Sequence, residues 1–327
     1  MPEIQGHRGA RACRPENTLA GLAYALSIGV DALEFDVTLT ADGGQILAHD
    51  LVVSAQAVLD TAPSTEGDPD FPYVGKRWSA LSLAQIATLD AGDRRPVAPY
   101  EATFRAVPGA RVPTLDQVGR LITSLGAYSV TLAVELKTNP RWPDADVRRL
   151  TEASLETLAA HQLAGQARIL GFDWRVLRAA EAADPAVPRV ALVEPMTWVP
   201  GSAWLAGLDP ADYGPRAGAV GCAAAGRDIG AAWLSPADDM TDAGLVAATH
   251  RECLRIAVWT VNDPARMADL IELGVDGIVT DRPDLLRQVL ARHGDKLPPP
   301  YPCPDQGQAT VAASVRHLEE SWLLLAS

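Results

Sequence analysis

The chain has 327 residues, of which 28 are Lys or Arg and 41 are Asp or Glu, giving a formal net charge of −13. Its hydrophobic content of 48% excludes a disordered chain, because disordered chains carry too few apolar side chains to form a core. The acidic excess, with no run of Lys and Arg, argues against nucleic acid or an anionic membrane as the main partner. An anionic small molecule remains a candidate ligand if a local positive centre overcomes the negative field of the chain.

No segment reaches the roughly 18 consecutive apolar residues that a membrane-spanning helix needs, so we expect no integral membrane segment. The first residues lack the basic and apolar regions of a signal peptide. This predicts a cytoplasmic location for the sequence as written, and a periplasmic or secreted location if a native signal peptide was removed. The four cysteines are widely spaced without a C-x-x-C pair, which is typical of isolated thiols.

Short apolar strands alternate with helical stretches along most of the chain. The strands are predicted near 4–7, 31–38, 130–136, 167–171, 189–193, 231–234, 254–260 and 276–280. The helices are predicted near 17–28, 114–125, 144–161, 173–183, 241–251, 264–273 and 283–292, with a poorly defined one around 200–207. Alternating strands and helices imply parallel pairing, and eight strands are the number that closes a barrel. We therefore predict an α/β fold, a (β/α)8 TIM barrel; an open doubly wound sheet is the alternative, but no G-x-G-x-x-G follows the first strand.

Two stretches interrupt this alternation. Residues 54–112 are rich in Pro, Gly and Asp, and we predict an inserted subdomain or lid with a helix near 82–89. Residues 294–327 form a Pro-rich C-terminal extension that closes with an amphipathic helix through Val311, Val315, Leu318 and Trp322. We expect that helix to dock on its own barrel, a homodimer contact being the alternative. The remaining chain, residues 1–293 with the insert, then forms one barrel domain.

Carboxylates alternate with apolar residues on two of the predicted strands. In the second strand Glu34 and Asp36 share one face, and in the third strand Glu135 and Lys137 do so. The apolar face of a barrel strand is covered by helices, so these polar faces are expected to point into the barrel. The desolvation of three buried carboxylates costs several kcal/mol each unless they are compensated. A divalent cation would compensate them, and oxygen ligands alone favour Mg²⁺ or Ca²⁺.

Internal ion pairs are the alternative explanation for these carboxylates. Arg8 and Lys137 are the candidate partners, but two cations do not neutralise three anions. The same two cations could hold phosphate oxygens. His7, after the first strand, and His49, after the run 45–47, suit a general acid and base because the pKa of histidine lies near neutrality. Gly6 and Gly9 would let the backbone approach a ligand closely.

Together these residues resemble a known family. The order of the motifs is similar to the signature of the glycerophosphodiester phosphodiesterases over residues 4–290. The matching segments are His7-Arg8-Gly9, Pro15-Glu16-Asn17-Thr18, Glu34-x-Asp36, His49-Asp50, Glu135-x-Lys137, Trp259-Thr260-Val261-Asn262 and Asp276-Gly277-Ile278-Val279-Thr280-Asp281-Arg282-Pro283. The resemblance implies a TIM barrel and one divalent cation, with a small glycerophosphodiester as substrate.

Position by position, the resemblance implies the same site as the residues do. Glu34, Asp36 and Glu135 would hold the metal, and His7 and His49 would act as acid and base. Arg8 and Lys137 would bind phosphate oxygens. Trp259 would line the substrate pocket, an aromatic residue of the barrel core being the equal alternative.

Other parts of the signature are expected to be architectural. Asn17 or Thr18 would cap the first helix, Glu16 is expected to be structural, and Asp281 would cap the last helix. Phe172 and Glu194 lie at strand ends on the face expected to be catalytic, without an assigned role.

The expected reaction is hydrolysis of a glycerophosphodiester to sn-glycerol 3-phosphate and an alcohol, with water or the glycerol 2-hydroxyl as the attacking group. A lysophospholipase D and a non-catalytic phosphate-binding barrel are the alternatives.

Overall fold

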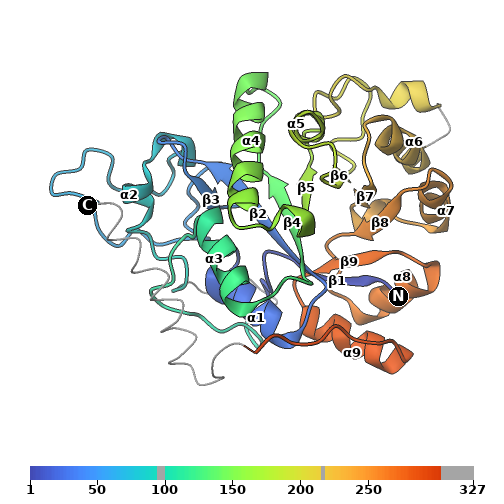
Figure 1. Cartoon of the computed structure of the whole chain (residues 1–327), viewed down its shortest axis with the longest axis horizontal. Helices are drawn as coiled ribbons and strands as arrows, with labels where there is room; N and C mark the ends of the chain where they lie inside the picture. Colours follow the sequence, from blue (N-terminus) through green and yellow to red (C-terminus); the bar gives the residue numbers. More distant parts are fainter. Residues whose placement is uncertain (94–99, 215–217, 303–327) are drawn as a thin grey trace.

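The computed structural model describes residues 1–93, 100–214 and 218–302, and this part of the chain forms an eight-stranded parallel barrel with one additional short strand (Figure 1). The strands are β1 Glu3–Gly6, β2 Ala32–Leu39, β3 Gln45–Leu47, β4 Thr131–Leu136, β5 Ala167–Gly171, β6 Arg189–Val193, β7 Trp233–Pro236, β8 Arg255–Val258 and β9 Gly277–Thr280. The ring closes because β1 pairs in parallel with both β2 and β9. β3 pairs antiparallel with β2 outside the ring. The predicted TIM barrel is confirmed.

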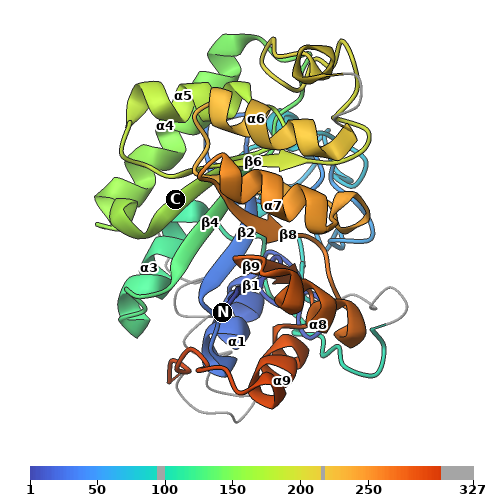
Figure 2. The same ribbon diagram turned by 90° about the vertical axis from the view of Figure 1, so that its right-hand side faces the viewer.

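Helices lie outside the strands (Figure 2). They are α1 Leu19–Ile28, α2 Leu83–Ile86, α3 Leu115–Leu125, α4 Asp144–Ala160, α5 Arg175–Ala183, α6 Gly221–Asp228, α7 Ala243–Arg251, α8 Pro264–Leu273 and α9 Pro283–His293. Short 3-10 turns are η1 Trp78–Ala80, η2 Ala164–Gln166, η3 Pro210–Tyr213, η4 Gly218–Val220 and η5 Asp238–Met240. Thr18 caps α1 by accepting a hydrogen bond from the Gly21 N–H.

Successive side chains along each strand point alternately outward and inward, so the barrel has an outer and an inner hydrophobic region. The outward side chains of β2 and β4, such as Phe35 and Val134, are fully buried in the layer between the strands and the helices. The inward side chains form a smaller cluster inside the barrel, in which Ala133 of β4 and Leu170 of β5 lie with Trp233 of β7. Since successive side chains point to opposite faces, Glu34, Asp36 and Glu135 share the interior with this second cluster.

The helix between β6 and β7 was expected around 200–207, and this placement is wrong. Residues 200–207 form turns in which Gly201 and Gly207 have positive φ angles. The helix of this connection is α6, which begins at Gly221 and consists largely of Ala and Gly. Small side chains give no apolar periodicity, so the sequence pattern did not reveal it.

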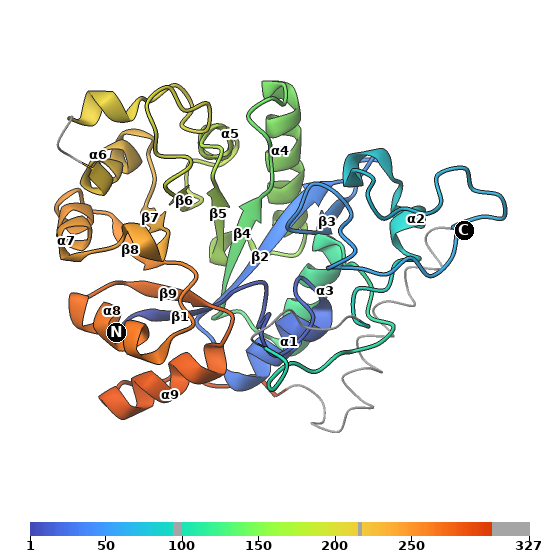
Figure 3. The same cartoon turned by 180° about the vertical axis from the view of Figure 1, so that it is seen from behind.

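The insert, residues 54–112, has a small core of its own next to β3. Tyr73, Trp78, Leu81 and Leu89 are buried there together with Ile46 of β3. α2 and η1 are the regular elements of its described part. Asp68 accepts hydrogen bonds from the Tyr73 hydroxyl and the Gln85 side chain, which ties its loops together. Figure 3 shows this region extending from the barrel beside β3.

The start of the C-terminal extension lies against the barrel. The Tyr301 N–H donates to the Leu26 carbonyl, and the Arg287 guanidinium donates to the Pro298 carbonyl. The expected amphipathic helix through Val311 and Trp322 falls outside the described residues, so its docking and the dimer contact stay predictions. Among the helices of the described ranges, none combines the length and apolar character needed to cross a membrane.

The outward face of β2 yields a prediction about stability. We expect Phe35→Ala to lower the free energy of unfolding by about 3–5 kcal/mol, because it removes a fully buried ring from the layer between β2 and the helices. Phe35→Leu, which keeps most of the apolar volume, should cost less. Urea denaturation followed by circular dichroism measures both, and equal losses in the two variants would contradict the packing argument.

Candidate active site

Three carboxylates meet at one end of the barrel interior. Asp36 of β2 lies opposite Glu135 of β4 in the strand register, and Glu34 lies one inward position earlier on β2. One oxygen from each of the three lies within 4.8 Å of the others, and all three residues are buried. The alternation predicted from sequence therefore brings these residues together as expected.

Two cations accompany the three carboxylates. Lys137 Nζ lies 2.6 Å from Glu135 Oε1 and 3.5 Å from Asp36 Oδ1. Arg8 Nε lies 3.3 Å from Asp36 Oδ2, and the Arg8 backbone N–H donates to Glu34 Oε2 at 2.8 Å. The guanidinium of Arg8 also donates to Glu16 Oε1 at 3.2 Å. Both cations are thus held among the carboxylates, and their two charges leave the three acidic groups undercompensated.

Burial and the charges within this group shift the pKa values of its carboxyl groups. Burial raises the pKa of Glu34 well above its ordinary value, and the neighbouring charges of Asp36 and Glu135 raise it further. The pKa of Asp36 is lowered despite its burial, because Lys137 and Arg8 lie beside it. A buried group of oxygen ligands with excess negative charge is the environment that a hard divalent cation requires. The three carboxylates could therefore hold one such ion.

His7 follows β1 and is oriented by a carboxylate. Its Nδ1 lies 2.5 Å from Asp281 Oδ1, and its Nε2 lies 4.0 Å from Glu34 Oε2. Asp281 is buried, and its pKa is lowered despite that burial, because His7 and Tyr100 donate to it. An ionised carboxylate only accepts hydrogen bonds, so Nδ1 of His7 carries the proton and Nε2 faces the carboxylates.

His49 lies just after β3, at the junction with the insert. Its side chain is 37% exposed, and its Nδ1 lies 2.8 Å from Asp50 Oδ1. Burial lowers the pKa of His49; Asp36 opposes this shift, while Lys137 and Arg8 strengthen it. A lowered pKa keeps the imidazole neutral at neutral pH, the state in which it can accept a proton.

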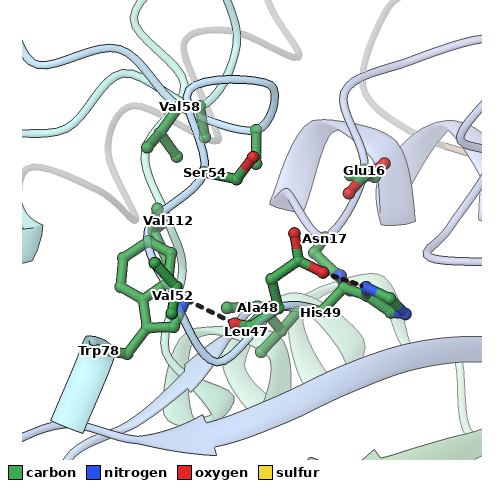
Figure 4. Close-up of a pocket in the computed structure, with 13 residues that line it drawn as sticks. Glu16, Asn17, Leu47, Ala48, His49, Val52, Ser54, Val58, Trp78 and Val112 are labelled. Atoms are coloured by element: carbon green, nitrogen blue, oxygen red, sulfur yellow. Dashed lines mark hydrogen bonds and ion pairs between the residues drawn. The ribbon is translucent and has the colours of Figure 1, made fainter. Parts of the chain in front are cut away.

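A pocket separates His49 from the insert (Figure 4). Glu16 and Asn17, at the start of the α1 segment, line one side together with His49. Val58 and Trp78 of the insert line the other side. His49 is therefore accessible from a hollow that has polar groups on the barrel side and apolar groups on the insert side.

Comparison with known proteins identifies the family. The sequence profile of the glycerophosphoryl diester phosphodiesterase family matches residues 7–285. The chain belongs to this family. The expected family and enzyme class are thereby confirmed.

Curated relatives and solved structures agree with this assignment. A glycerophosphodiester phosphodiesterase of Bacillus subtilis (strain 168) is 28% identical over 288 residues, covering 86% of this chain and 84% of the relative. One of Caldanaerobacter subterraneus subsp. tengcongensis is 26% identical over 297 residues, covering 89% and 98%.

Two solved structures share the fold. A structure from Silicibacter pomeroyi DSS-3, provisionally assigned as a glycerophosphoryl diester phosphodiesterase, superposes with a TM-score of 0.76 at 27% identity, covering 91% of this chain and 95% of that one. An Oleispira antarctica phosphodiesterase, solved with the product sn-glycerol-3-phosphate, has a TM-score of 0.66 at 22% identity, with 89% and 97% covered. The second similarity supports the fold alone.

Trp259 of this family member lies at the end of β8, inside the barrel. Its ring meets the ring of Phe172 edge to face at 5.3 Å, and its Nε1 donates to the Ser235 carbonyl. Lys137 Nζ lies 5.7 Å from the Phe172 ring centroid. Trp259 and Phe172 therefore belong to the inner cluster and border the site at Lys137, which is compatible with both expectations for Trp259.

Sequence reasoning missed the role of Asp281. It was expected to cap the last helix, but the N-cap residue of α9 is Arg282, for which no side-chain cap hydrogen bond is found in the described structure. Asp281 instead accepts from His7 and Tyr100, which are distant in sequence. In the sequence, an Asp next to the start of a helix looks the same whether or not it caps that helix. The available signal for its contact with His7 was the position of Asp281 at the end of a strand, on the face expected to be catalytic.

In the segment between β1 and α1, the helix cap expected at Asn17 or Thr18 is Thr18. Asn17 does not cap α1; its Nδ2 donates to Asp36 Oδ2, and its Oδ1 accepts from the Asp36 N–H. Gly6 and Gly9 permit a close backbone-to-backbone contact, because a Cβ on Gly6 would lie 2.2 Å from the Gly9 carbonyl oxygen; the close approach of a ligand stays a prediction. The matching segment before α1 therefore holds Asp36 by two hydrogen bonds, one to its carboxylate and one to its backbone N–H.

The raised pKa of Glu34 gives a prediction about pH. Glu34 retains in the folded protein a proton that the unfolded chain releases above the ordinary Glu pKa. The contribution of Glu34 to the stability of the metal-free protein should therefore be lost as the pH rises through this range. Glu34→Gln should flatten that dependence, since the amide cannot ionise. At a concentration of Mg²⁺ or Ca²⁺ 100 times its dissociation constant, wild type should gain about 2.7 kcal/mol, and Glu34→Gln clearly less.

Thermal unfolding from pH 4 to pH 8, with chelator and with added cation, measures both effects. Glu181→Gln is the matched control, because Glu181 is an exposed partner of Arg189 far from the carboxylates. A Glu34→Gln profile that coincides with wild type under both conditions would contradict the account of this site.

Proposed function

We propose that this chain hydrolyses glycerophosphodiesters to sn-glycerol 3-phosphate and an alcohol, with one divalent cation, Mg²⁺ or Ca²⁺, and histidine acid–base catalysis. The observation that carries the proposal is the position of His7. Its Nδ1 is held by Asp281, while its Nε2 faces the buried carboxylates from 4.0 Å. An oriented proton-transfer group beside a candidate cation site is what hydrolysis of a phosphodiester requires.

Glu34, Asp36 and Glu135 would hold the cation. When bound, the ion supplies charge neutralisation for the phosphate and Lewis-acid activation of the attacking oxygen. With the ion present, the three carboxylates, Arg8 and Lys137 carry a small net positive charge. That local sign suits the single negative charge of a phosphodiester, although the chain as a whole is strongly acidic.

His7 and His49 would divide the proton transfers. One removes the proton of the attacking oxygen, and the other protonates the leaving alkoxide. Asp281 supports His7 by accepting its Nδ1–H, which fixes the tautomer and the ring plane. The lowered pKa of His49 keeps this second imidazole available as a neutral group.

Lys137 and Arg8 would contact phosphate oxygens from opposite sides of Asp36. Lys137 Nζ lies 3.5 Å from Asp36 Oδ1, and Arg8 Nε lies 3.3 Å from Asp36 Oδ2. Trp259 and Phe172 would form the wall of the substrate pocket next to Lys137.

The alternatives receive less support from the described structure. A lysophospholipase D needs an open apolar groove for an acyl chain, but Tyr73 and Phe104 of the insert are buried, and Tyr100 donates to Asp281. A barrel that only binds phosphate has no need for a histidine oriented by a buried carboxylate.

A substrate panel tests the reaction. Purified protein is treated with chelator, dialysed, and assayed with glycerophosphocholine and with lysophosphatidylcholine, with and without added Mg²⁺ or Ca²⁺. We expect release of glycerol 3-phosphate from glycerophosphocholine only after cation is restored, at a rate at least about tenfold above that for the lysolipid. Full activity with chelator would overturn the metal dependence. A preference for the lysolipid would favour lysophospholipase D, and inactivity toward both would favour the binding barrel.

Histidine variants test the acid–base assignment. We expect His7→Gln and His49→Gln each to lower kcat for glycerophosphocholine by about 10²- to 10⁴-fold, because each would remove one proton transfer. His161→Gln is the matched control: His161 also pairs with a carboxylate, Asp116 at 2.9 Å, but in the helical layer. The control should retain kcat within about twofold, given the small effects of changes distant from a site. Wild-type turnover by either site variant would refute its catalytic role.

A further inference from the structure

Asp281 is contacted by side chains from three separate parts of the chain. Its Oδ1 accepts from His7 Nδ1 at 2.5 Å. Its Oδ2 accepts from the Tyr100 hydroxyl at 2.6 Å and from Asn262 Nδ2 at 2.9 Å. Arg11 Nη1 lies farther away, 3.9 Å from Oδ2. The two oxygens are therefore used differently: one serves the imidazole, and the other is held by Tyr100 and Asn262.

The direction of each hydrogen bond follows from the partners. Asn262 Oδ1 accepts from the Asp281 backbone N–H at 2.9 Å and from the Thr280 hydroxyl at 3.0 Å, so the other end of this amide is a donor. Its Nδ2 lies 2.9 Å from the Tyr100 oxygen and donates to it. The tyrosine oxygen therefore accepts from Asn262, and its own proton goes to Asp281. Burial raises the pKa of Tyr100 above its ordinary value, which keeps this proton on the hydroxyl.

Tyr100 comes from the insert, but the loop that carries it is fixed on the barrel. The N–H groups of Thr103 and Phe104 donate to the Tyr100 carbonyl and close a turn. The Thr103 hydroxyl donates to the Ala12 carbonyl at 2.8 Å, and the Arg105 N–H donates to the Cys13 carbonyl at 2.9 Å. Both acceptors lie in the segment between β1 and α1. Tyr100 is thus presented to Asp281 from a defined direction.

We propose that Tyr100 is a positioning residue for His7: the insert holds its hydroxyl against Asp281 and thereby fixes the carboxylate that orients the imidazole. The insert then completes the acid–base machinery in addition to lining the pocket beside His49. This inference rests on the proposed function, because it assigns His7 a proton transfer whose geometry matters. A carboxylate with one oxygen anchored by two donors has a fixed plane, and a fixed plane sets the direction of the imidazole.

The test compares two Tyr→Phe changes within the insert. Tyr100→Phe removes the 2.6 Å hydrogen bond to Asp281, and Tyr73→Phe removes an equally short hydrogen bond to Asp68 inside the insert. We expect Tyr100→Phe to lower kcat for glycerophosphocholine about tenfold with little change in KM, because small misorientation of a reacting group is costly. Tyr73→Phe should leave kcat within about twofold of wild type, because its hydroxyl does not touch the site.

A double-mutant cycle with Asp281→Asn shows whether Tyr100 acts through Asp281. In that background Tyr100→Phe should lower kcat by less than about twofold further, since the two residues then no longer act as a unit. If Tyr100 only supported the insert, its effect would fall on KM, would resemble that of Tyr73→Phe, and would multiply with that of Asp281→Asn. Any of these results in active enzyme would overturn the proposal.

A spectroscopic readout separates this inference from the proposed function. The Nδ1–H proton resonance of His7, assigned by its loss in His7→Gln, is observed in metal-free protein without substrate. We expect it to shift in Tyr100→Phe and to stay unchanged in Tyr73→Phe. An unshifted resonance in Tyr100→Phe would refute the positioning role even if no hydrolysis were detected. An inactive wild type with a shifted resonance would refute the proposed function while leaving the contact established.

Discussion

The burial of three carboxylates at one end of a closed barrel is the constraint on which the rest of the site depends. Side chains alternate between the two faces of each parallel strand, which places Glu34, Asp36 and Glu135 inside the barrel, away from bulk water. Desolvated charges must be paired or must bind a cation, because leaving them alone costs several kcal/mol each. Lys137 and Arg8 compensate only part of this charge. The same imbalance would destabilise an ordinary core, and it makes these three carboxylates a candidate site for a divalent ion.

The segment between β1 and α1 has the conformation that this compensation requires. Arg8 and Asn17 both adopt positive φ angles, which non-glycine residues rarely do. In that conformation the Arg8 backbone N–H reaches Glu34, and the Asn17 amide contacts Asp36 at two points. Local backbone strain is thus offset by hydrogen bonds to buried charges, as is common where a site needs fixed geometry. The family signature in this segment therefore has a physical role: it holds the strand that carries Glu34 and Asp36.

The site lies where the barrel and the insert meet, and each of these two parts has its own hydrophobic core. The barrel supplies His7, Asp281 and the carboxylates, whereas the insert has its own hydrophobic cluster and supplies one wall of the pocket beside His49. Tyr100 connects the two, because its hydroxyl reaches Asp281 from the insert side. The contact between Asp281 and His7 is therefore linked to the docking of the insert, and the proposed positioning role of Tyr100 rests on this link.

Much of this could be predicted from residue patterns alone, because the relevant forces are local. Eight strands alternating with helices predict the barrel. Alternation of side chains along β2 and β4 predicts the three inward carboxylates, since side-chain direction in a strand depends only on neighbouring residues. The sequence pattern misplaces α6 because Ala and Gly give no apolar period, and it predicts a helix cap at Asp281 because caps and site residues look alike locally. The contacts of Asp281 with His7 and Tyr100 join positions 274 and 181 residues apart. Only closure of the barrel and docking of the insert bring such positions together, so the sequence determined the chemistry of the site and the tertiary structure decided which groups orient it.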